Sequence, residues 1–395
     1  MHISKITRKA SVAAISVLGL LGAVVASAPS SSATLDHVAR STAKVPVVSV
    51  KVGMTPYFEY QPFIIAHDLG LDAKMGLNLR VVDISGSGSL PTEELARGIV
   101  DIAPGCYSCE FPYIKSVPSI RDFMITNQFG GFIVIGRKGV PTYSQLVKTV
   151  GATRAKSAVL HSFVGKSFDL QVATYGPLID GALKAAGISP ATIHINSFAN
   201  DAQAALAFEH GTGDYYMGSL PQEVTLLNQP GAKFVNVGGS EILGPAGLWY
   251  STYYTTAAWL STHEATALKL MAVWYRTMRY IRAYPAYAYK IWTADINREA
   301  AAHYSVTQVR YITTHLESYD TLQQAAAGEF NPKSALYYLR AAKYYSNPSA
   351  GSTIPSGAKV TTYIVEEAYF RRLLADKALV NWINSALVPP PDGRG

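Results

Sequence analysis

Hydrophobic residues recur along the chain in two periods, every second position over short runs and every third or fourth over longer ones. In the first third, this pattern predicts strands at 47–53, 77–84, 99–103, 123–126 and 132–135, with helices at 63–69, 92–97 and 110–116. A second series has strands at 157–160, 193–196, 215–217 and 234–237, and helices at 170–186 and 201–209. Such alternation is typical of parallel sheets with crossover helices. From residue 261 onward the pattern is helical.

A short sequence pattern occurs once in each series. Leu95-Ala96 precedes Gly98, and Asp101 follows three residues after this glycine; Leu206-Ala207 precedes Gly211, and Asp214 follows at the same distance. In both places a helix is predicted to end near the glycine, and the aspartate to begin a short strand. The repetition indicates two lobes of related build, although any helix–glycine–strand unit produces a similar pattern.

The first 28 residues have the features of a secretory signal peptide. Lys5, Arg8 and Lys9 form a positive segment, an apolar stretch covers 12–25, and Ala26-Ser27-Ala28 offers a cleavage site. The alternative is a membrane anchor, but the stretch is short for a bilayer of roughly 30 Å. We therefore expect cleavage near Ala28, a flexible leader over 29–44, and a periplasmic or secreted protein. No cysteine follows the apolar stretch, so we expect no lipid anchor.

Composition and charge restrict the class of protein further. The chain has 395 residues, of which 49% are hydrophobic and 15% charged, and this excludes a disordered chain. The formal net charge is +7, but three of the positive charges fall in the predicted signal peptide and the others are scattered. Nucleic-acid binding requires clustered positive charge, so we expect no nucleic-acid partner.

The only two cysteines, Cys106 and Cys109, form a C-x-x-C motif. In an exported protein such a pair is a disulfide or two free thiols. Zinc would require two further ligands, and the nine histidines form no paired array, so we expect no metal and no cofactor. A redox role remains a minor hypothesis, because it requires the pair to open a helix after a strand.

Four segments in order resemble a known family. They are 51–71 (KVGMTPYFEYQPFIIAHDLGL), 76–82 (GLNLRVV), 86–89 (GSGS) and 95–103 (LARGIVDIA). The chain resembles the solute-binding proteins of ABC importers for nitrate, sulfonates, taurine and thiamine-pyrimidine precursors. The resemblance is close over about 48–138 and looser over 156–239, and the helical remainder matches only in kind.

The resemblance implies an α/β fold with two lobes, the periplasmic-binding-protein type II fold, with two parallel-type sheets, crossover helices and a helical C-terminal region. The first lobe would comprise 45–137 plus 241–395, and the second 138–240, with 249–255 as a returning strand. It further implies a monomer that captures a small solute in the cleft between the lobes and delivers it to the membrane subunits of an ABC importer.

Two loops that follow predicted strands carry the main candidates for the ligand site, because ligands of open α/β sheets bind beyond the carboxyl ends of strands. Tyr57 and Phe58 can enclose an organic group, while Glu59 either pairs with a cation or is a solvated loop acid. Ser85-Gly86-Ser87-Gly88-Ser89 offers N–H groups and hydroxyls to an oxyanion, although a flexible turn with a helix cap fits it equally. We expect a small organic anion held at Ser85–Ser89.

Three further loops contribute Tyr107, Ser219, His161 and Lys166 to the predicted ligand site. Lys166 either supplies a point charge or lies on the surface, and His161 either donates to a ligand or caps a helix. The run Gly165-Lys166-Ser167 lacks the glycine that a phosphate-binding loop has five residues earlier, since Leu160 stands there. A nucleotide-hydrolysing loop is therefore excluded.

The sequence contains no G-x-S-x-G and no H-E-x-x-H motif, so we expect no catalytic residues. The alternative is an enzyme on the same fold, because fold alone does not determine function. Sulfinate desulfinases and pyrimidine synthases resemble this family and use cysteine or histidine in the cleft. The candidates for such a role here are Cys106, Cys109, His67 and His161.

Overall fold

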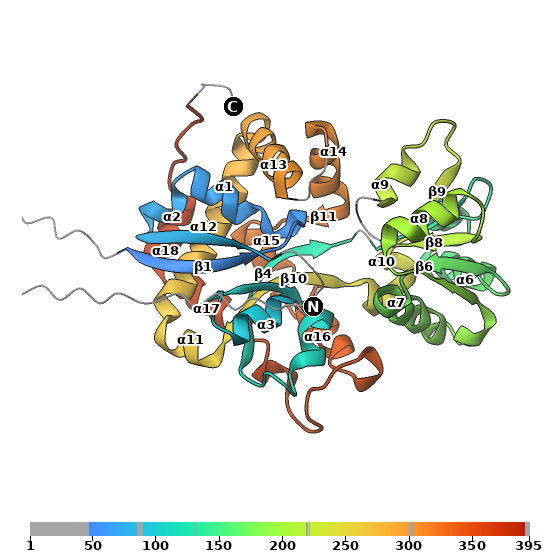
Figure 1. Cartoon of the computed structure of the whole chain (residues 1–395), viewed down its shortest axis with the longest axis horizontal. Helices are drawn as coiled ribbons and strands as arrows, with labels where there is room; N and C mark the ends of the chain where they lie inside the picture. Colours follow the sequence, from blue (N-terminus) through green and yellow to red (C-terminus); the bar gives the residue numbers. More distant parts are fainter. Residues whose placement is uncertain are drawn as a thin grey trace, which may run out of the picture. The chain divides into compact units, whose positions relative to one another are not determined.

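The computed structural model describes residues 47–84, 90–130, 132–218, 220, 222–299 and 303–391. Six of its strands form one layer (Figure 1). β1 (Val48–Met54) pairs in parallel with β2 (Leu77–Asp83). The order β11-β4-β10-β3 follows, with bounds Glu317–Ser318, Ile120–Phe129, Trp249–Thr256 and Ala103–Cys106. A parallel bridge between Val52 and Ile102 joins the two groups. We call these six strands the first sheet.

The second sheet has five strands in the order β7-β6-β8-β5-β9. Their bounds are His194–Ser197, Ser167–Leu170, Tyr215–Met217, Val134–Arg137 and Phe234–Gly238. β6 is parallel to β7 and β8, whereas β5 is antiparallel to β8 and β9. In Figure 1 these strands lie among the green helices.

Helices connect the strands and make up most of the C-terminal third. Those of the first two thirds are α1 (Pro62–Asp68), α2 (Leu71–Lys74), α3 (Leu90–Ala96), α4 (Tyr107–Glu110), α5 (Tyr143–Val150), α6 (Ala152–Ser162), α7 (Val172–Ala185), α8 (Asp201–Glu209), α9 (Gln222–Leu227) and α10 (Ser240–Leu243). Those that follow β10 are α11 (Ala257–Thr262), α12 (Glu264–Ala283), α13 (Pro285–Glu299), α14 (Val306–Tyr311), the π-helix η5 (Ile312–Leu316), α15 (Leu322–Ala327), α16 (Tyr338–Tyr345), α17 (Glu366–Ala375) and α18 (Lys377–Asn384). No described helix is long and apolar enough to cross a membrane.

The predicted α/β class and the helical C-terminal region are confirmed. Both sheets contain parallel pairs joined by helices, as the alternation predicts. They are nevertheless mixed, because β10 runs antiparallel to β3 and β4 within the first sheet and β5 runs antiparallel to its neighbours in the second. The return strand predicted at 249–255 is β10, one residue longer than expected.

The strand predicted at 157–160 is wrong. These residues lie in α6, whose buried side chains are Ala155, Val159 and Leu160. These side chains occupy one face of the helix. The apolar run at the end of α6 is too short to distinguish the helical period from that of a strand. The strand of this region is β6, which begins at Ser167.

Two further predictions are displaced. The strand predicted at 99–103 is β3, which begins only at Ala103, because the residues before it complete the turn after Gly98. The helix predicted at 110–116 begins earlier: α4 spans Tyr107–Glu110, and a 3-10 turn, η2, continues it over Phe111–Tyr113. The cysteine pair therefore stands where a strand ends and a helix begins.

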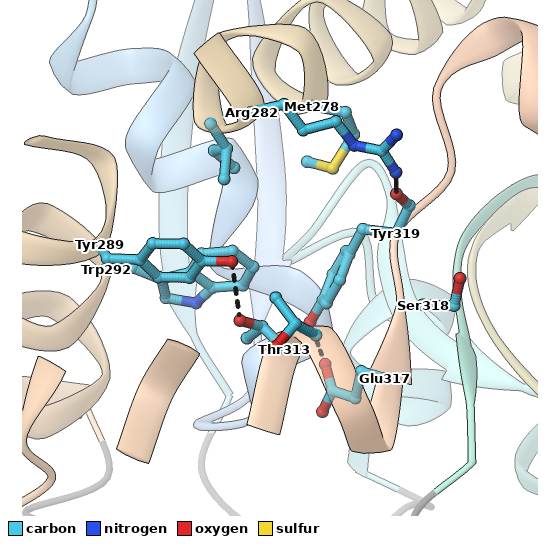
Figure 2. A pocket seen from close by; sticks show the side chains of 10 residues that line it. Met278, Arg282, Tyr289, Trp292, Thr313, Glu317, Ser318 and Tyr319 are labelled. Atoms are coloured by element: carbon cyan, nitrogen blue, oxygen red, sulfur yellow. Dashed lines mark hydrogen bonds between the residues drawn. The ribbon is translucent and has the colours of Figure 1, made fainter. Parts of the chain in front are cut away.

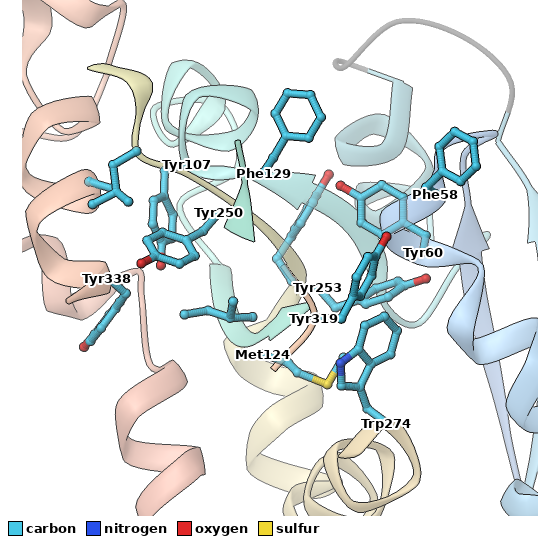
Figure 3. Packing of buried hydrophobic residues seen from close by; sticks show 14 of the residues in the cluster. Phe58, Tyr60, Tyr107, Met124, Phe129, Tyr250, Tyr253, Trp274, Tyr319 and Tyr338 are labelled. Atoms are coloured by element: carbon cyan, nitrogen blue, oxygen red, sulfur yellow. The ribbon is translucent and has the colours of Figure 1, made fainter. Parts of the chain in front are cut away.

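Aromatic side chains dominate the core beside the first sheet (Figure 3). Phe63 of α1 is fully buried, and its ring centroid lies 5.2 Å from that of Tyr253 on β10 and 5.1 Å from that of Trp274 on α12. Tyr60 meets Tyr253 edge-on at 5.5 Å. This packing connects α1, the return strand and the C-terminal helix α12, so the last third of the chain completes the core of the first.

The repeated aspartate of the sequence pattern makes the same contacts in both sheets. Asp101 accepts a hydrogen bond from the backbone N–H of Lys51 at 2.8 Å, and its own N–H donates to the carbonyl of Lys51. Asp214 accepts from the N–H of Ser167 at 2.9 Å and donates to the carbonyl of Ser167. We call this contact the aspartate clip. The two sheets therefore share one local contact at the places where the sequence pattern repeats.

Candidate ligand-binding site

Four strands of the first sheet end at one edge, where the return strand begins. β1, β2, β3 and β4 end there, at Met54, Asp83, Cys106 and Phe129, and antiparallel β10 begins at Trp249. We call this edge the carboxyl edge of the first sheet. Such edges are where α/β folds bind ligands, because side chains from several loops converge there.

Glu59 lies at the carboxyl edge, in the 3-10 helix η1 (Phe58–Tyr60) that follows β1. The hydroxyl of Tyr60 donates to the carbonyl of Gly105 at 2.8 Å and fixes η1 against β3. Burial raises the pKa of Glu59 to about 7, and the nearby hydroxyl of Ser251 opposes the rise. Of the two alternatives for Glu59, the solvated loop acid does not fit this environment.

Glu317, at the start of β11, is a second acid at this edge, and its side chain is buried. Its Oε2 accepts hydrogen bonds from the side-chain amide of Asn127, at 3.1 Å, and from the hydroxyl of Tyr319. Burial and the negative charge of Glu59 raise the pKa of Glu317 well above its usual range, against the effect of these two donors. Both acids therefore hold a proton more readily than a solvent-exposed glutamate does.

Several buried polar atoms near this edge have no hydrogen-bond partner among the described residues. They are Thr55 Oγ1, both amide atoms of Gln61, Asn127 Oδ1 and Glu317 Oε1. More than nine tenths of buried polar groups in proteins are paired, so this concentration is unusual. Hydroxyl, amide and carboxyl groups together can bind a polar solute through several hydrogen bonds at once.

The structure places the predicted aromatic residues differently from one another. Tyr57 is 48% exposed, as a residue facing a ligand would be in the free protein. Phe58 is buried, with its ring packed edge-on at 5.2 Å against that of Tyr304. Tyr107 is also buried and stacks on Phe111 at 5.7 Å. Phe58 and Tyr107 therefore contribute to the core, and only Tyr57 presents an open ring.

The sequence includes His161 and Lys166 in the site only because they follow a strand predicted at 157–160, and that strand is wrong. With the strand at β6, both residues precede the strand and lie at the end opposite its carboxyl end. His161 is in the last turn of α6 with its Nδ1 2.8 Å from the carbonyl oxygen of Ser157, and Lys166 Nζ lies 3.7 Å from Asp214. The strand's position gives no support to a ligand contact at either residue.

Two predicted parts of the site, Ser85–Ser89 and Ser219, lie outside the described residues. The described neighbours of the first are β2, which ends at Asp83, and α3, which begins at Leu90. Two cavities, of about 240 and 370 Å³, lie in the described part of the chain, and no described residue that the sequence predicted to bind ligand lines either one.

Cys106 and Cys109 form a disulfide, which confirms the first of the two predicted alternatives. Cys106 caps α4, because its sulfur accepts a hydrogen bond from the N–H of Cys109 at 3.1 Å. Within the described ranges, no group of three His, Cys, Asp or Glu side chains is placed to hold a metal ion.

Replacing both cysteines by serine should lower the free energy of unfolding by about 2 kcal/mol, because the crosslink closes a loop of only a few residues. Serine can keep the cap of α4 through its oxygen, so the lost free energy of unfolding measures the contribution of the crosslink alone. Urea unfolding of the variant and of the reduced natural protein should agree. A loss above about 4 kcal/mol would mean that the sulfurs also carry core packing.

Sequence reasoning missed Glu317. It lies in the helical region where the resemblance is only general, and no motif surrounds it. Its one signal is the pair Glu317-Ser318 between two helical stretches, which is too short to predict a strand. β11 pairs with the end of β4, Glu317 opposite Phe129, and this non-local contact brings the acid to the carboxyl edge.

Solved structures of solute-binding proteins share this fold. The periplasmic aliphatic sulphonate binding protein SsuA from Escherichia coli matches with a TM-score of 0.59 and 13% sequence identity, over 82% of this chain and 99% of that protein. A putative periplasmic sulfonate-binding protein SsuA from Methylobacillus flagellatus matches with a TM-score of 0.56 and 12% identity, over 85% and 96%. The zinc-bound ligand binding component of an ABC-type import system from Staphylococcus aureus gives 0.56 and 13%, over 82% and 99%.

No known family model matches the sequence, and no curated protein matches it. At identities this low the structural likeness establishes the fold alone. The fold is that of periplasmic solute-binding proteins, as the four sequence segments predicted.

Proposed function

We propose that this protein is an extracytoplasmic solute-binding protein that captures a small organic solute and delivers it to an ABC importer. The observation that carries the proposal is the group of unpartnered buried polar atoms at the carboxyl edge of the first sheet. It lies where this fold class binds ligands. The predicted signal peptide is consistent with export, and the structural neighbours include binding components of ABC importers.

We further propose that the solute carries an anionic group. The support comes from the sequence, in which Ser85–Ser89 follows a strand and precedes a helix and offers several N–H groups and hydroxyls. The exposed ring of Tyr57 would lie against the organic part of the solute. The buried acids do not oppose an anion, because a carboxyl group that holds its proton can donate a hydrogen bond to it.

The enzyme alternative has less support. The disulfide occupies both cysteines, so neither is a thiol nucleophile in this form of the protein. His67 is half exposed on α1, with its Nδ1 2.8 Å from Asp72. His161 lies in the last turn of α6. Among the described contacts, none brings either histidine to the carboxyl edge of the first sheet.

The solute can be identified by native mass spectrometry of the protein purified from its own host. Calorimetry with that solute then tests the site through Thr55→Val, which keeps the shape of a buried side chain and removes a hydroxyl without a described partner. We expect binding to weaken by about 0.5–1.5 kcal/mol, the value of one hydrogen bond, with little change in stability.

The matched control is Thr277→Val on α12, because the Thr277 hydroxyl is buried and donates to the carbonyl of Val273 at 2.8 Å. This variant should lose stability and keep its affinity. Equal affinities in Thr55→Val and the natural protein would contradict a solute site at the carboxyl edge.

The anion site has its own test in Gly88→Leu and Ser89→Ala. A bulky residue at 88 blocks several N–H groups at once, so Gly88→Leu should weaken binding far more than the loss of the Ser89 hydroxyl, which removes one bond of about 0.5–1.5 kcal/mol. Calorimetry with the identified solute measures both. Natural affinity in Gly88→Leu would place the anion elsewhere.

A further inference from the structure

The smaller of the two cavities has the composition of a binding site (Figure 2). It has a volume of about 240 Å³ and lies among α12, α13, the π-helix η5 and β11. An engineered cavity of about 150 Å³ accepts benzene, so this one has room for a molecule of about eight non-hydrogen atoms. Of the residues considered for the solute, only the neighbouring acid Glu317 lines it.

One wall of the cavity has a guanidinium group at one end and a carboxyl group at the other. The guanidinium of Arg282 donates to the backbone carbonyl of Tyr319 at 2.6 Å, while the hydroxyl of the same tyrosine donates to Glu317. The length of one tyrosine therefore separates the positive group from the acid, as Figure 2 shows. Arg282 is exposed and Glu317 is 4% exposed, so the acid marks the deep end.

A second wall, which adjoins the ring of Tyr319, is aromatic. The rings of Tyr289 and Trp292 are nearly parallel, with 4° between their planes and 5.8 Å between their centroids. Trp292 also meets the ring of Tyr319 edge-on at 5.1 Å. The hydroxyl of Thr313 donates to that of Tyr289 at 3.2 Å and fixes its ring. Such faces accept methylene groups and attract cations through their π electrons.

Two buried polar atoms of the lining have no hydrogen-bond partner within the described ranges. One is Nε1 of Trp292, a residue only 1% exposed, and the other is Oε1 of Glu317. A buried indole N–H normally finds an acceptor, and a buried carboxyl oxygen normally finds a donor. A donor and an acceptor are thus both available to a molecule inside the cavity.

We propose that this cavity binds a small ω-amino acid, with its ammonium group at Glu317, its chain along the Tyr289–Trp292 wall and its acidic group at Arg282. The inference goes beyond the proposed function, because it assigns a second ligand to a cavity that shares only Glu317 with the proposed solute site. A zwitterion fits better than a simple cation, which would meet Arg282 at the mouth. It also fits better than a simple anion, which would leave the deep acid without a partner.

Ligand binding is linked to a proton on Glu317. The groups that face this carboxyl are Glu59 from η1, Asn127 from β4, Tyr304 and Tyr319. Because burial and Glu59 raise the pKa of Glu317, its carboxyl holds a proton more readily than an exposed glutamate does. An ammonium group instead pairs with the ionised carboxylate. We therefore expect affinity to rise with pH and binding to release protons.

The test uses the full exported chain and three probes of equal chain length: 5-aminopentanoate, pentanoate and pentylamine. By calorimetry we expect 5-aminopentanoate to bind at least tenfold tighter than either single-charge probe. Titrations in two buffers of different ionisation enthalpy should show proton release. Similar affinities for the three probes, or no binding of 5-aminopentanoate at 10 mM, would overturn the proposal.

Two variants locate the probe. Glu317→Gln keeps the shape and acceptor of the protonated acid, and it should weaken 5-aminopentanoate binding at least tenfold and abolish proton release. Arg282→Gln changes an exposed residue, so it still tests the site if Glu317→Gln does not fold. It should weaken the binding of 5-aminopentanoate and leave the binding of pentylamine unchanged or tighter. Thr55→Val, outside the cavity, is the control. If Thr55→Val weakens the probe while Arg282→Gln does not, the probe occupies the solute site and the proposal is wrong.

Discussion

Replacing Phe63 by alanine should lower the free energy of unfolding by about 3–5 kcal/mol, the range for large-to-small changes of buried aromatic residues. The ring is fully buried and contacts Tyr253 and Trp274, which come from the return strand and the C-terminal helix α12. The variant therefore leaves a cavity where three distant segments meet. Urea unfolding followed by tryptophan fluorescence measures the loss.

Two variants control for this result. Phe63→Leu keeps most of the volume and should lose much less than Phe63→Ala. Leu374→Ala changes a side chain that is 43% exposed and should alter stability by well under 2 kcal/mol. If Phe63→Ala and Leu374→Ala lost equal stability, the aromatic cluster would not be the core of this part of the molecule.

Stability should fall as the pH rises from 4 to 8, because a cluster of buried acids must give up protons. Asp122, on β4, is fully buried, and burial raises its pKa to about 6. Burial, and the charge of Asp122 next, also raise the pKa values of Glu110 and Glu366 well above their usual range. A group with a raised pKa in the folded protein stabilises it fully below its unfolded pKa, and the contribution is lost as the pH passes the folded pKa.

For Asp122 alone the loss amounts to about 3 kcal/mol, since each pKa unit corresponds to about 1.4 kcal/mol. Asp122→Asn keeps the shape of the protonated acid and cannot ionise. We expect it to be more stable than the natural protein at pH 8, and the difference to shrink toward pH 4. Chemical unfolding at pH 4.5, 6 and 8 measures both.

Glu93→Gln provides the control, because Glu93 is an exposed acid on α3. It should leave the pH dependence unchanged. A natural protein that is equally stable at pH 4.5 and pH 8 would show that Asp122, Glu110 and Glu366 do not hold protons in the folded state.

The fold could be predicted where local pattern and tertiary environment agree. β8 has the predicted bounds. β1 begins and ends only one residue later than predicted, because its valines mark the strand clearly. The residues 157–160 show the opposite case, since their apolar side chains cover one face of α6 and only the whole helix reveals the period. The mixture of parallel and antiparallel strand pairs within each sheet could not be predicted either, because strand direction depends on contacts between residues far apart in sequence.

The site could be predicted only in part. The loop after β1 was correctly placed at the carboxyl edge, but Tyr57 and Phe58 look alike in sequence and only one of them is exposed. An aromatic residue of the core and one that faces a ligand have the same chemistry, so only the structure shows which of the two is buried. Glu317 reaches the edge by pairing with β4 across nearly 190 residues, and no local signal encodes such a contact.

The aspartate clip has a consequence for the order of folding. It joins residues 50 positions apart in the first sheet and 47 positions apart in the second. The entropy lost when a chain closes on itself depends only on the logarithm of the loop length, so the two closures cost nearly the same. Chain length therefore favours neither sheet as the first to form. The aromatic packing around Phe63 also requires α12 and β10. We therefore expect the core beside the first sheet to be completed after the second sheet.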